Sequence, residues 1–232
     1  SHQVEDILVY PRQPLQSESA PQRESFTIDQ AFYSSANIFP QSSLEVGEPA
    51  IMRDYRVVLV TINPFQYNPH IRTLSVITSA DISLVCSGSG GINTKETIAA
   101  PSKVFENYYR STILNYDQVR TREETKQPHY LFIYPNNNSL LQTLQVLTDW
   151  KHQMGYKVTL ASTMETGTTD IQIQNYIQDA YDNWDNRPDF VCLVGDAGGS
   201  INIPTHHISN GYGDQFYALL EGNDILADLF VG

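Results

Sequence analysis

The stretch Tyr130-Leu-Phe-Ile-Tyr134, followed later by Phe190-Val-Cys-Leu-Val194, decides the fold of this chain. A third strand-like run, Tyr156-Lys-Val-Thr-Leu160, lies between them, and Leu229-Phe-Val231 forms a last apolar run. Helical patterns separate these runs, which predicts a parallel sheet whose strands are joined by crossover helices. Functional side chains gather at the carboxyl ends of the strands in such sheets. Asp196 follows one of these ends and is therefore a candidate functional residue.

Two amphipathic helices are expected between the strands. The first begins after Pro135-Asn-Asn-Asn138 and places Leu140, Leu144 and Leu147 on one face, with Trp150 beside them. The second runs from about Thr169 to Trp184, with one apolar face made by Ile173, Ile177, Ala180 and Trp184. This i, i+4, i+7, i+11 spacing is typical of a helix packed on a core.

The preceding part of the chain has a different pattern, dominated by short strands. Tyr55–Ile62 is rich in β-branched residues, and a turn at Gln66–Pro69 leads to a returning strand at His70–Ile77. Ile82–Cys86 is a further expected strand, and Val104–Leu114 fits one short helix. Strands separated by turn signals predict an antiparallel β module.

The change from one pattern to the other predicts the domain organisation. We expect a β-rich domain over residues 1–116, a linker over 117–128 and an α/β domain over 129–232. The linker carries many charged side chains, which indicates exposure to solvent. Arg120 and Arg122 lie within it.

Length and composition limit the possible functions. The chain has 232 residues, of which 41% are hydrophobic and 17% are charged, and this composition fits a globular protein with a substantial core. The formal net charge of -12 argues against nucleic acid and anionic membranes as partners. No run of about 18 apolar residues could span a bilayer, and no signal peptide is recognisable.

Neither cysteine has the surroundings of a nucleophile. Cys86 and Cys192 lie inside apolar runs, where cysteine behaves as a small buried hydrophobic residue. His206 and His207 are adjacent, which invites the interpretation of a metal-binding or catalytic pair. Adjacent side chains of an extended segment point in opposite directions, so a loop or surface role is favoured for them.

Several motifs in order along the chain resemble the gingipain-type cysteine peptidases, the C25 family. In the α/β half the matching stretches are Asp149–Val158, Phe190–Asp196 with Ile203-Pro204, Asp214–Tyr217, Glu221–Asp224 and Asp228–Gly232. In the β half, Arg53–Val57 and Pro64–Pro69 more loosely resemble the propeptide of that family.

The resemblance implies a caspase-like α/β domain of two sub-domains, of which this chain holds the first, preceded by a propeptide that contacts it in cis. The catalytic cysteine and histidine are expected beyond the position of Gly232. We therefore assign no catalytic and no organic-cofactor residue here, and expect protein or peptide substrates to bind the missing half. An uncovered sheet edge at the end of the chain predicts self-association. The implied location is secreted or on a bacterial cell surface.

The resemblance also implies a structural calcium ion. Carboxylates of Asp196, Asp224 and Asp228 and backbone carbonyls of Glu221 and Leu226 are the implied ligands. Calcium takes six to eight oxygen ligands of these two kinds. The residues alone support a plainer interpretation, in which Asp224 belongs to a turn and Asp196 caps a loop.

The function expected from the whole sequence is that of a fragment of a secreted cysteine endopeptidase zymogen. The fragment itself is expected to be inactive. Two alternatives stay open. One is a sortase-like C25 member of a secretion system, and the other is a non-catalytic surface or interaction module on a degenerate peptidase scaffold.

Overall fold

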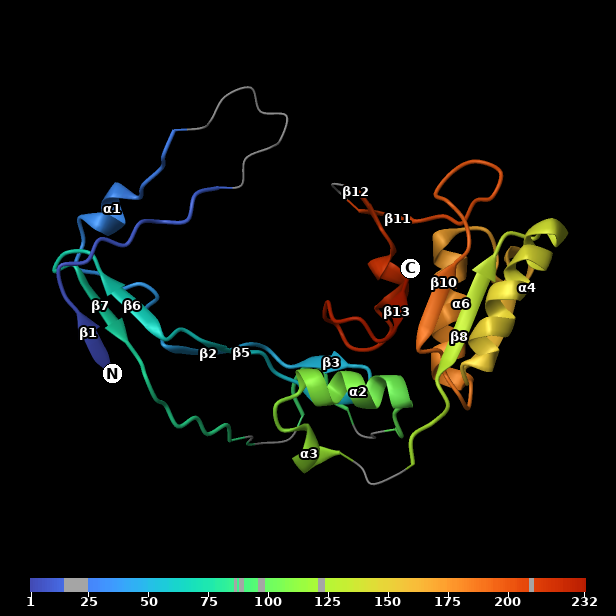
Figure 1. Cartoon of the computed structure of the whole chain (residues 1–232), viewed down its shortest axis with the longest axis horizontal. Helices are drawn as coiled ribbons and strands as arrows, with labels where there is room; N and C mark the ends of the chain where they lie inside the picture. The colour runs from blue at the N-terminus through green and yellow to red at the C-terminus, as the bar shows by residue number, and fades with distance from the viewer. Residues whose placement is uncertain (15–24, 86, 88–89, 96–98, 121–123, 209–210) are drawn as a thin grey trace. The chain divides into compact units, whose positions relative to one another are not determined.

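The computed structural model describes residues 1–14, 25–85, 87, 90–95, 99–120, 124–208 and 211–232. These residues form two compact units (Figure 1). The first unit consists of residues 1–48 and 58–89, and the second of residues 49–57 and 90–232. The division differs from the expected boundary at 117–128, because a nine-residue excursion and the segment after residue 90 pack with the α/β part.

The first unit is an antiparallel β module with one short helix. A three-stranded sheet has the order β1-β7-β6, and a two-stranded ribbon pairs β2 with β5. The elements are β1 His2–Val4, α1 Gln30–Tyr33, β2 Leu44–Val46, β5 Val60–Ile62, β6 Phe65–Asn68 and β7 Thr73–Val76. The β-rich character predicted for this part of the chain is confirmed.

Three local predictions for this half were wrong. The residues assigned to a turn at Gln66–Pro69 lie mostly in β6, and the chain reverses just after it, between Asn68 and Thr73. Residues 82–85 form no strand. The run Tyr55–Ile62 is two strands, because Tyr55–Val57 pairs in the second unit and Val60–Ile62 in the first. Cys86 lies outside the described residues.

The second unit contains a four-stranded sheet of order β13-β10-β8-β9. All three neighbouring pairs are parallel, as expected. The strands are β8 His129–Tyr134, β9 Lys157–Ser162, β10 Phe190–Leu193 and β13 Phe230–Val231, and the long helices between them are α4 Asn138–Gln153 and α6 Asp170–Asn183 (Figure 1).

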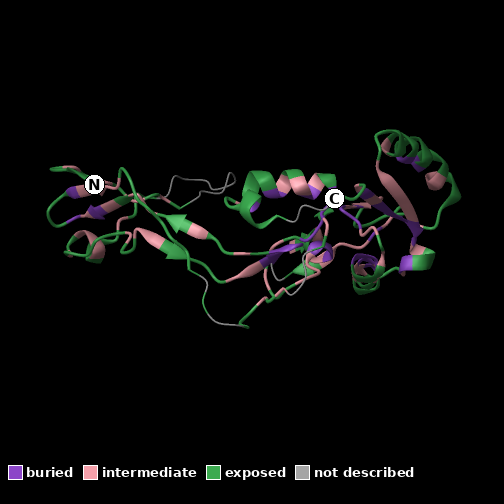
Figure 2. Cartoon of the chain, turned by 90° about the horizontal axis from the view of Figure 1, so that it is seen from below, coloured by how far each residue is buried: buried purple, intermediate pink, exposed green. Residues whose placement is uncertain are grey.

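Alternation along β8 builds two separate cores, one on each face of the sheet. Leu131 and Ile133 pack with Ile173 and Ile177 of α6. Phe132 and Tyr134 point to the other face and pack with α4 through Leu144. Successive strand side chains point to opposite faces, so a central strand buried on both sides reads as one continuous apolar run. Figure 2 shows the buried residues along the sheet and on its helices.

The helix boundaries follow from local chemistry. Thr169 caps α6, and Gln172 completes a capping box, which satisfies backbone N–H groups at the helix start. The apolar face predicted for α6 is confirmed, since Ile173, Ile177 and Ala180 are fully buried. The face predicted for α4 is only partly correct. Leu144 is buried, whereas Leu147 is 38% exposed and Trp150 is 53% exposed.

The remaining elements of the second unit are short, apart from one helix of ten residues. They are the hairpin strands β3 Ala50–Met52 and β4 Tyr55–Val57, helices α2 Lys103–Thr112, α3 Tyr116–Val119 and α5 Thr163–Thr166, strands β11 His206–Ile208 and β12 Gly211–Gly213, and the 3-10 helix η1 Asp214–Ala218. Helix α2 confirms the short helix expected near Val104–Leu114. Among the described residues, no helix is both long and apolar enough to cross a membrane.

His129, the first residue of β8, is fully buried beside the loop that leads into β10. Its Nδ1 lies 2.6 Å from the carbonyl oxygen of Asn186, its Nε2 lies 2.9 Å from Oγ1 of Thr159, and its ring stacks on Trp184. Burial lowers the pKa of His129 to about 4. The folded state therefore holds a neutral imidazole at pH values where an exposed histidine is already charged.

This buried histidine should make the second unit sensitive to acid. Its folded pKa lies below the unfolded value of about 6.5, so its contribution to stability is lost as the pH falls from 6.5 towards 4. We predict that His129→Gln is destabilising at pH 7, and less so at pH 4.5 by up to about 3 kcal/mol. Urea unfolding of both proteins at the two pH values measures the difference. An equal penalty at both pH values would contradict the assignment.

Candidate functional site

The tip of the β3–β4 hairpin carries a buried arginine, Arg53, the largest of the fully buried side chains. Arg53 is only 2% exposed, although it lies in a tight turn between Met52 and Tyr55. Its φ of 51° is in the left-handed region, which is unfavourable for a non-glycine residue. The surrounding contacts must therefore hold Arg53 in this conformation.

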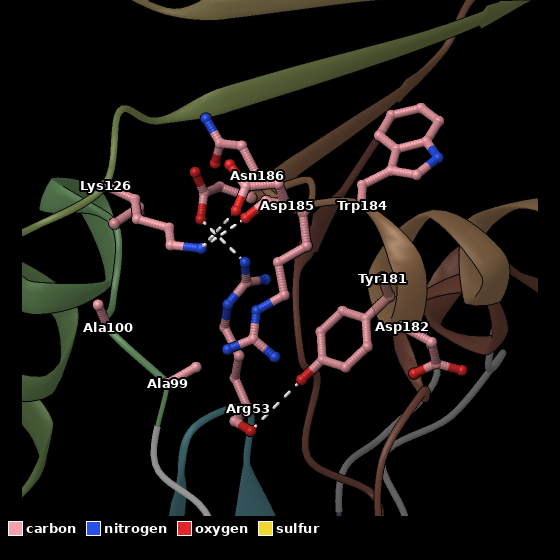
Figure 3. Close-up of a pocket in the computed structure, with 12 residues that line it drawn as sticks. Arg53, Ala99, Ala100, Lys126, Tyr181, Asp182, Trp184, Asp185 and Asn186 are labelled. Carbon is pink, nitrogen blue, oxygen red and sulfur yellow. Dashed lines mark hydrogen bonds and ion pairs between the residues drawn. The ribbon is translucent and has the colours of Figure 1, made fainter.

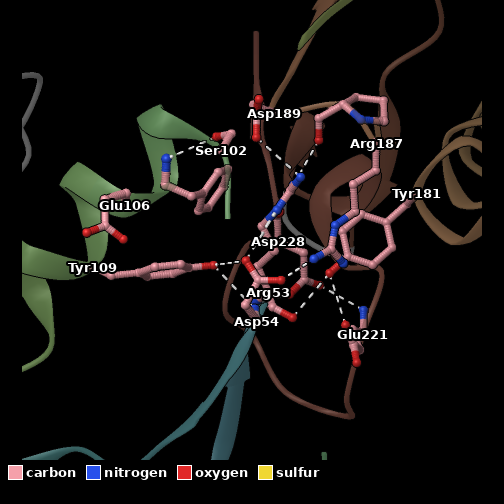
Figure 4. Close-up of polar contacts among 12 residues, drawn as sticks. Arg53, Asp54, Ser102, Glu106, Tyr109, Tyr181, Arg187, Asp189, Glu221 and Asp228 are labelled. Carbon is pink, nitrogen blue, oxygen red and sulfur yellow. Dashed lines mark hydrogen bonds and ion pairs between the residues drawn. The ribbon is translucent and has the colours of Figure 1, made fainter. Parts of the chain in front are cut away.

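The guanidinium of Arg53 is enclosed by acceptors from the end of the chain (Figure 4). Its Nη1 donates to the carbonyl oxygens of Pro188 and Asp228, both at 2.8 Å, and Nη2 pairs with Oδ1 of Asp189 at 3.2 Å. The backbone N–H of Arg53 donates to Oδ1 of Asp228 at 2.9 Å. The Tyr181 hydroxyl donates to the Arg53 carbonyl oxygen at 3.3 Å.

Asp54, the next residue of the turn, forms a second set of buried contacts. It is fully buried, and its Oδ2 accepts a hydrogen bond of 2.6 Å from the Tyr109 hydroxyl on α2. The guanidinium of Arg187 pairs with Oδ1 of the same carboxylate. Phe105, one turn before Tyr109 on α2, lies 4.3 Å beneath the Arg53 guanidinium. Hairpin, helix α2 and the loop before β10 are thereby joined.

Burial is the main cause of the raised pKa values of two carboxyl groups in this cluster. It raises the pKa of Asp189, and the guanidinium of Arg53 acts against that rise. It also raises the pKa of Asp228 to about 6, although three backbone N–H groups lower it. Both carboxylates depend on their partners, since an unpaired buried charge is costly.

A cavity of about 180 Å³ adjoins the cluster (Figure 3). Arg53 and Asp189 form part of its wall, together with Lys126, Trp184 and Asp185. Among the described residues that line it there is neither cysteine nor histidine. The cavity therefore lacks the nucleophile and base of a cysteine peptidase and belongs to the charged cluster.

The predicted calcium ligands are brought together only in part. Asp224 and Asp228 both face the hairpin, where Ile51 N–H donates to Oδ2 of Asp224 at 2.8 Å and Arg53 N–H donates to Asp228. Oδ1 of Asp224 accepts from Leu226 N–H at 2.9 Å. Oδ2 of Asp228 accepts from the N–H groups of Leu220 and Glu221, so every oxygen of the two carboxylates holds an N–H group.

The other predicted ligands have different surroundings. Asp196 is exposed, and its Oδ1 accepts from the N–H of Ala197 at 2.7 Å. The Glu221 side chain pairs with Lys95 and accepts from the Tyr181 hydroxyl. In the described part of the chain, no three His, Cys, Asp or Glu side chains are placed to share a metal ion. While the hairpin is docked, its N–H groups compete with a calcium ion for the carboxylate oxygens of Asp224 and Asp228, and the calcium site stays a prediction.

Cys192 and His206 pack against neighbouring side chains, and His207 is exposed. Cys192 of β10 packs with Phe132, and burial raises the pKa of its thiol, which disfavours the reactive thiolate. His206 of β11 places Nδ1 2.7 Å from Oδ2 of Asp170 and stacks on Phe216. His207 is exposed on the same strand, beside Tyr212.

The fold and the buried cluster define an α/β sub-domain with a parallel sheet, into which the β3–β4 hairpin is docked through Arg53. The family Propeptide_C25 matches residues 1–123, and peptidase family C25 matches residues 123–232. The chain belongs to the C25 family, with its propeptide and the start of its catalytic domain, as the sequence motifs indicated. The two matches meet within the predicted linker at 117–128.

Two named relatives align with nearly the whole chain. Gingipain R2 of Porphyromonas gingivalis W83 is 28% identical over 233 residues, which cover 98% of this chain and 31% of the relative. Lys-gingipain of Porphyromonas gingivalis ATCC 33277 is 25% identical over 223 residues, or 92% of this chain and 13% of the relative. The chain therefore spans about a third or less of the length of these relatives.

Two solved structures also align with parts of the chain. The Arg-specific cysteine proteinase gingipain R aligns with 49% of this chain and 26% of its own, at 24% identity and a TM-score of 0.41. The complex of Porphyromonas gingivalis RgpB pro- and mature domains aligns with 45% of this chain and 24% of its own, at 25% identity and the same TM-score.

The family boundary gives the buried cluster its meaning. Arg53, Asp54 and α2 lie in the part matched by the propeptide, whereas Asp189 and Asp228 lie in the part matched by the peptidase. Sequence reasoning used Arg53 only as a motif residue and overlooked Asp189. The available signal was an acid at the entry to a predicted central strand, where an unpaired carboxylate would be costly.

The bond between Tyr109 and Asp54 gives a direct test of this cluster. Tyr109→Phe removes the hydroxyl that donates to the buried carboxylate, and we expect a loss of about 1.5–3 kcal/mol of unfolding free energy. Tyr108→Phe on the same helix is the matched control, because Tyr108 is partly exposed and packs chiefly through its ring. Denaturant unfolding measures both, and equal losses would contradict the role of the buried hydroxyl.

The bonding of Asp224 and Asp228 predicts how this form responds to calcium. Since N–H groups occupy their carboxylate oxygens, millimolar calcium should leave the melting temperature of the chain at its value in EDTA. Magnesium serves as the control for ionic strength and nonspecific binding. A calcium-specific rise that is lost in Asp224→Asn would show that the ion displaces the hairpin contacts.

Proposed function

We propose that the parent protein is a bacterial cysteine endopeptidase, secreted or held at the cell surface, and that it is made as a zymogen. The observation that carries this proposal is the burial of Arg53, from the propeptide-matched part, among acceptors of the peptidase-matched part. The named relatives are gingipains, which supports peptidase chemistry in the parent.

The chemistry proposed for the parent is thiolate attack on a peptide carbonyl. A histidine accepts the thiol proton and passes it to the leaving amine, and water then releases the acyl group from the cysteine. Both residues are proposed to lie C-terminal to residue 232 in the parent, together with the substrate pocket. Cys192 of β10 is half-buried, and it is proposed to take no part in the reaction.

The propeptide is proposed to keep the enzyme latent until the linker is cut. Arg120 lies at the end of α3, where it pairs with Glu106 and Asp117, and Arg122 lies outside the described residues. Calcium binding by Asp196, Glu221, Asp224, Leu226 and Asp228 is proposed only for the form from which the hairpin has departed.

The test is an assay of the full parent protein before and after removal of residues 1–123. We expect cleavage of mixed peptide substrates that rises on propeptide removal, is abolished by thiol alkylation, and is absent when the candidate nucleophile is changed from Cys to Ala. A control variant that removes the other thiol, Cys192→Ala, should retain the activity.

The same assay separates the alternatives. Joining of the acyl group to an added amine, rather than release to water, would indicate a sortase-like member of the family. A folded parent protein without a cysteine-dependent reaction on any peptide would contradict the proposal and favour a non-catalytic surface module.

A further inference from the structure

Arg120, the residue at which α3 ends, is held by two carboxylates. Its Nη1 lies 3.4 Å from Oε1 of Glu106 on α2, and its Nε lies 3.6 Å from Oδ1 of Asp117 on α3. The backbone N–H of Arg120 donates to the carbonyl oxygen of Tyr116 at 2.9 Å. Both the guanidinium and the backbone N–H of this arginine are therefore engaged in the folded chain.

Glu106 is the centre of an ion-pair network that includes this arginine. Its carboxylate accepts two further bonds from Arg110, from Nε at 3.0 Å and from Nη2 at 2.7 Å, and one from the Tyr116 hydroxyl. Arg110 also reaches Asp117 through Nη1 at 2.8 Å. We call the following residues the Glu106 network: Glu106, Arg110, Tyr116, Asp117 and Arg120.

The network is stronger than a single pair of surface charges. Glu106 is only 17% exposed and several donors converge on it, whereas isolated exposed ion pairs contribute little to stability. Burial acts to raise the pKa of Glu106, but the bonds from Tyr116 and Arg110 outweigh it and lower the pKa. The carboxylate is therefore charged at neutral pH and able to hold Arg120.

Helix α3 depends on these contacts. A helix of four residues has almost no stability of its own. Its first residue, Tyr116, is buried against Tyr55 and Tyr109. Its other end is held by the ion pair between Arg120 and α2. The chain at Arg120 can thus become extended only when the Glu106 network opens.

We propose that the Glu106 network protects the peptide bond after Arg120 from proteolysis. A protease that selects a basic residue binds that side chain in a pocket with a carboxylate of its own. The guanidinium of Arg120 must leave its present carboxylates to enter such a pocket, and α3 must open locally before the bond is cut. Hydrolysis then adds water, which leaves a carboxyl group on Arg120 and an amine on the next residue.

The network thereby controls where the segment between the propeptide and the peptidase part is cut. Without it, Arg120 is a processing site, and with it, Arg120 is withheld. The inference rests on the zymogen proposal only for its role in the parent protein, since the protection itself is a property of α2 and α3.

Limited digestion by added trypsin tests the protection in the parent protein with its candidate nucleophile changed to Ala. Mass spectrometry gives the initial rate of cutting after Arg120, divided by the rate after Arg56, an exposed arginine of β4 that reports opening of the second unit. Glu106→Gln removes the charge and keeps the size of the side chain, and we expect this ratio to rise at least about fivefold. Asp117→Asn should raise the ratio less, because Asp117 is 74% exposed.

Glu124→Gln is the matched control. It makes the same chemical change four residues after Arg120, at an exposed position, and should leave the ratio unchanged. Equal ratios in the Glu106→Gln and Glu124→Gln proteins would overturn the inference, as would equal acceleration of both cuts in Glu106→Gln. Since trypsin is added from outside, the outcome does not depend on whether the parent is itself a peptidase.

Discussion

The second unit depends on one buried charge, the guanidinium of Arg53. It lies among three fully buried aspartates, Asp54, Asp189 and Asp228, and joins a hairpin to the ends of β10 and β13. Taking these groups out of water is costly, and the cost is offset only when the geometry satisfies nearly all of them. The positive φ of Arg53 shows that the backbone conforms to this requirement.

This constraint explains why the compact units do not follow the family boundary. The propeptide match ends at residue 123, yet residues 49–57 and α2 pack with the peptidase-matched residues. Tyr55 of the hairpin forms an aromatic cluster with Tyr109 and Tyr116, and Phe105 stacks on Phe230 of the edge strand β13. The propeptide thus contributes part of the core of the second unit and has a separate β module besides.

The same geometry gives the loop between Glu221 and Asp228 its present role. The resemblance to the C25 family implies that the acidic residues of this loop are metal ligands. In this structure Asp224 and Asp228 accept hydrogen bonds from the N–H groups of Ile51 and Arg53. Ile51 lies in β3 and Arg53 in the turn that follows it, so the two N–H groups are only two residues apart in the chain. Two carboxylates four positions apart in the loop meet that spacing.

The sequence by itself determined the parallel sheet, the two long helices and the family. Those features depend on local periodicity and on motifs, and the strands at 129–134 and 190–193 needed no knowledge of distant residues. It also indicated that Cys192 is structural, because the cysteine lies inside an apolar strand. For the β half, local patterns misplaced a turn and joined two strands at 55–62.

Only the tertiary structure decided where the charged residues meet. Arg53 and Asp189 are far apart in the sequence, and neither lies in a pattern that specifies a partner. The energy of a buried ion pair depends on the position of both groups and on the water excluded around them, which no local pattern encodes. The sequence could therefore name the propeptide and the peptidase part, while the fold alone showed the arginine that joins them.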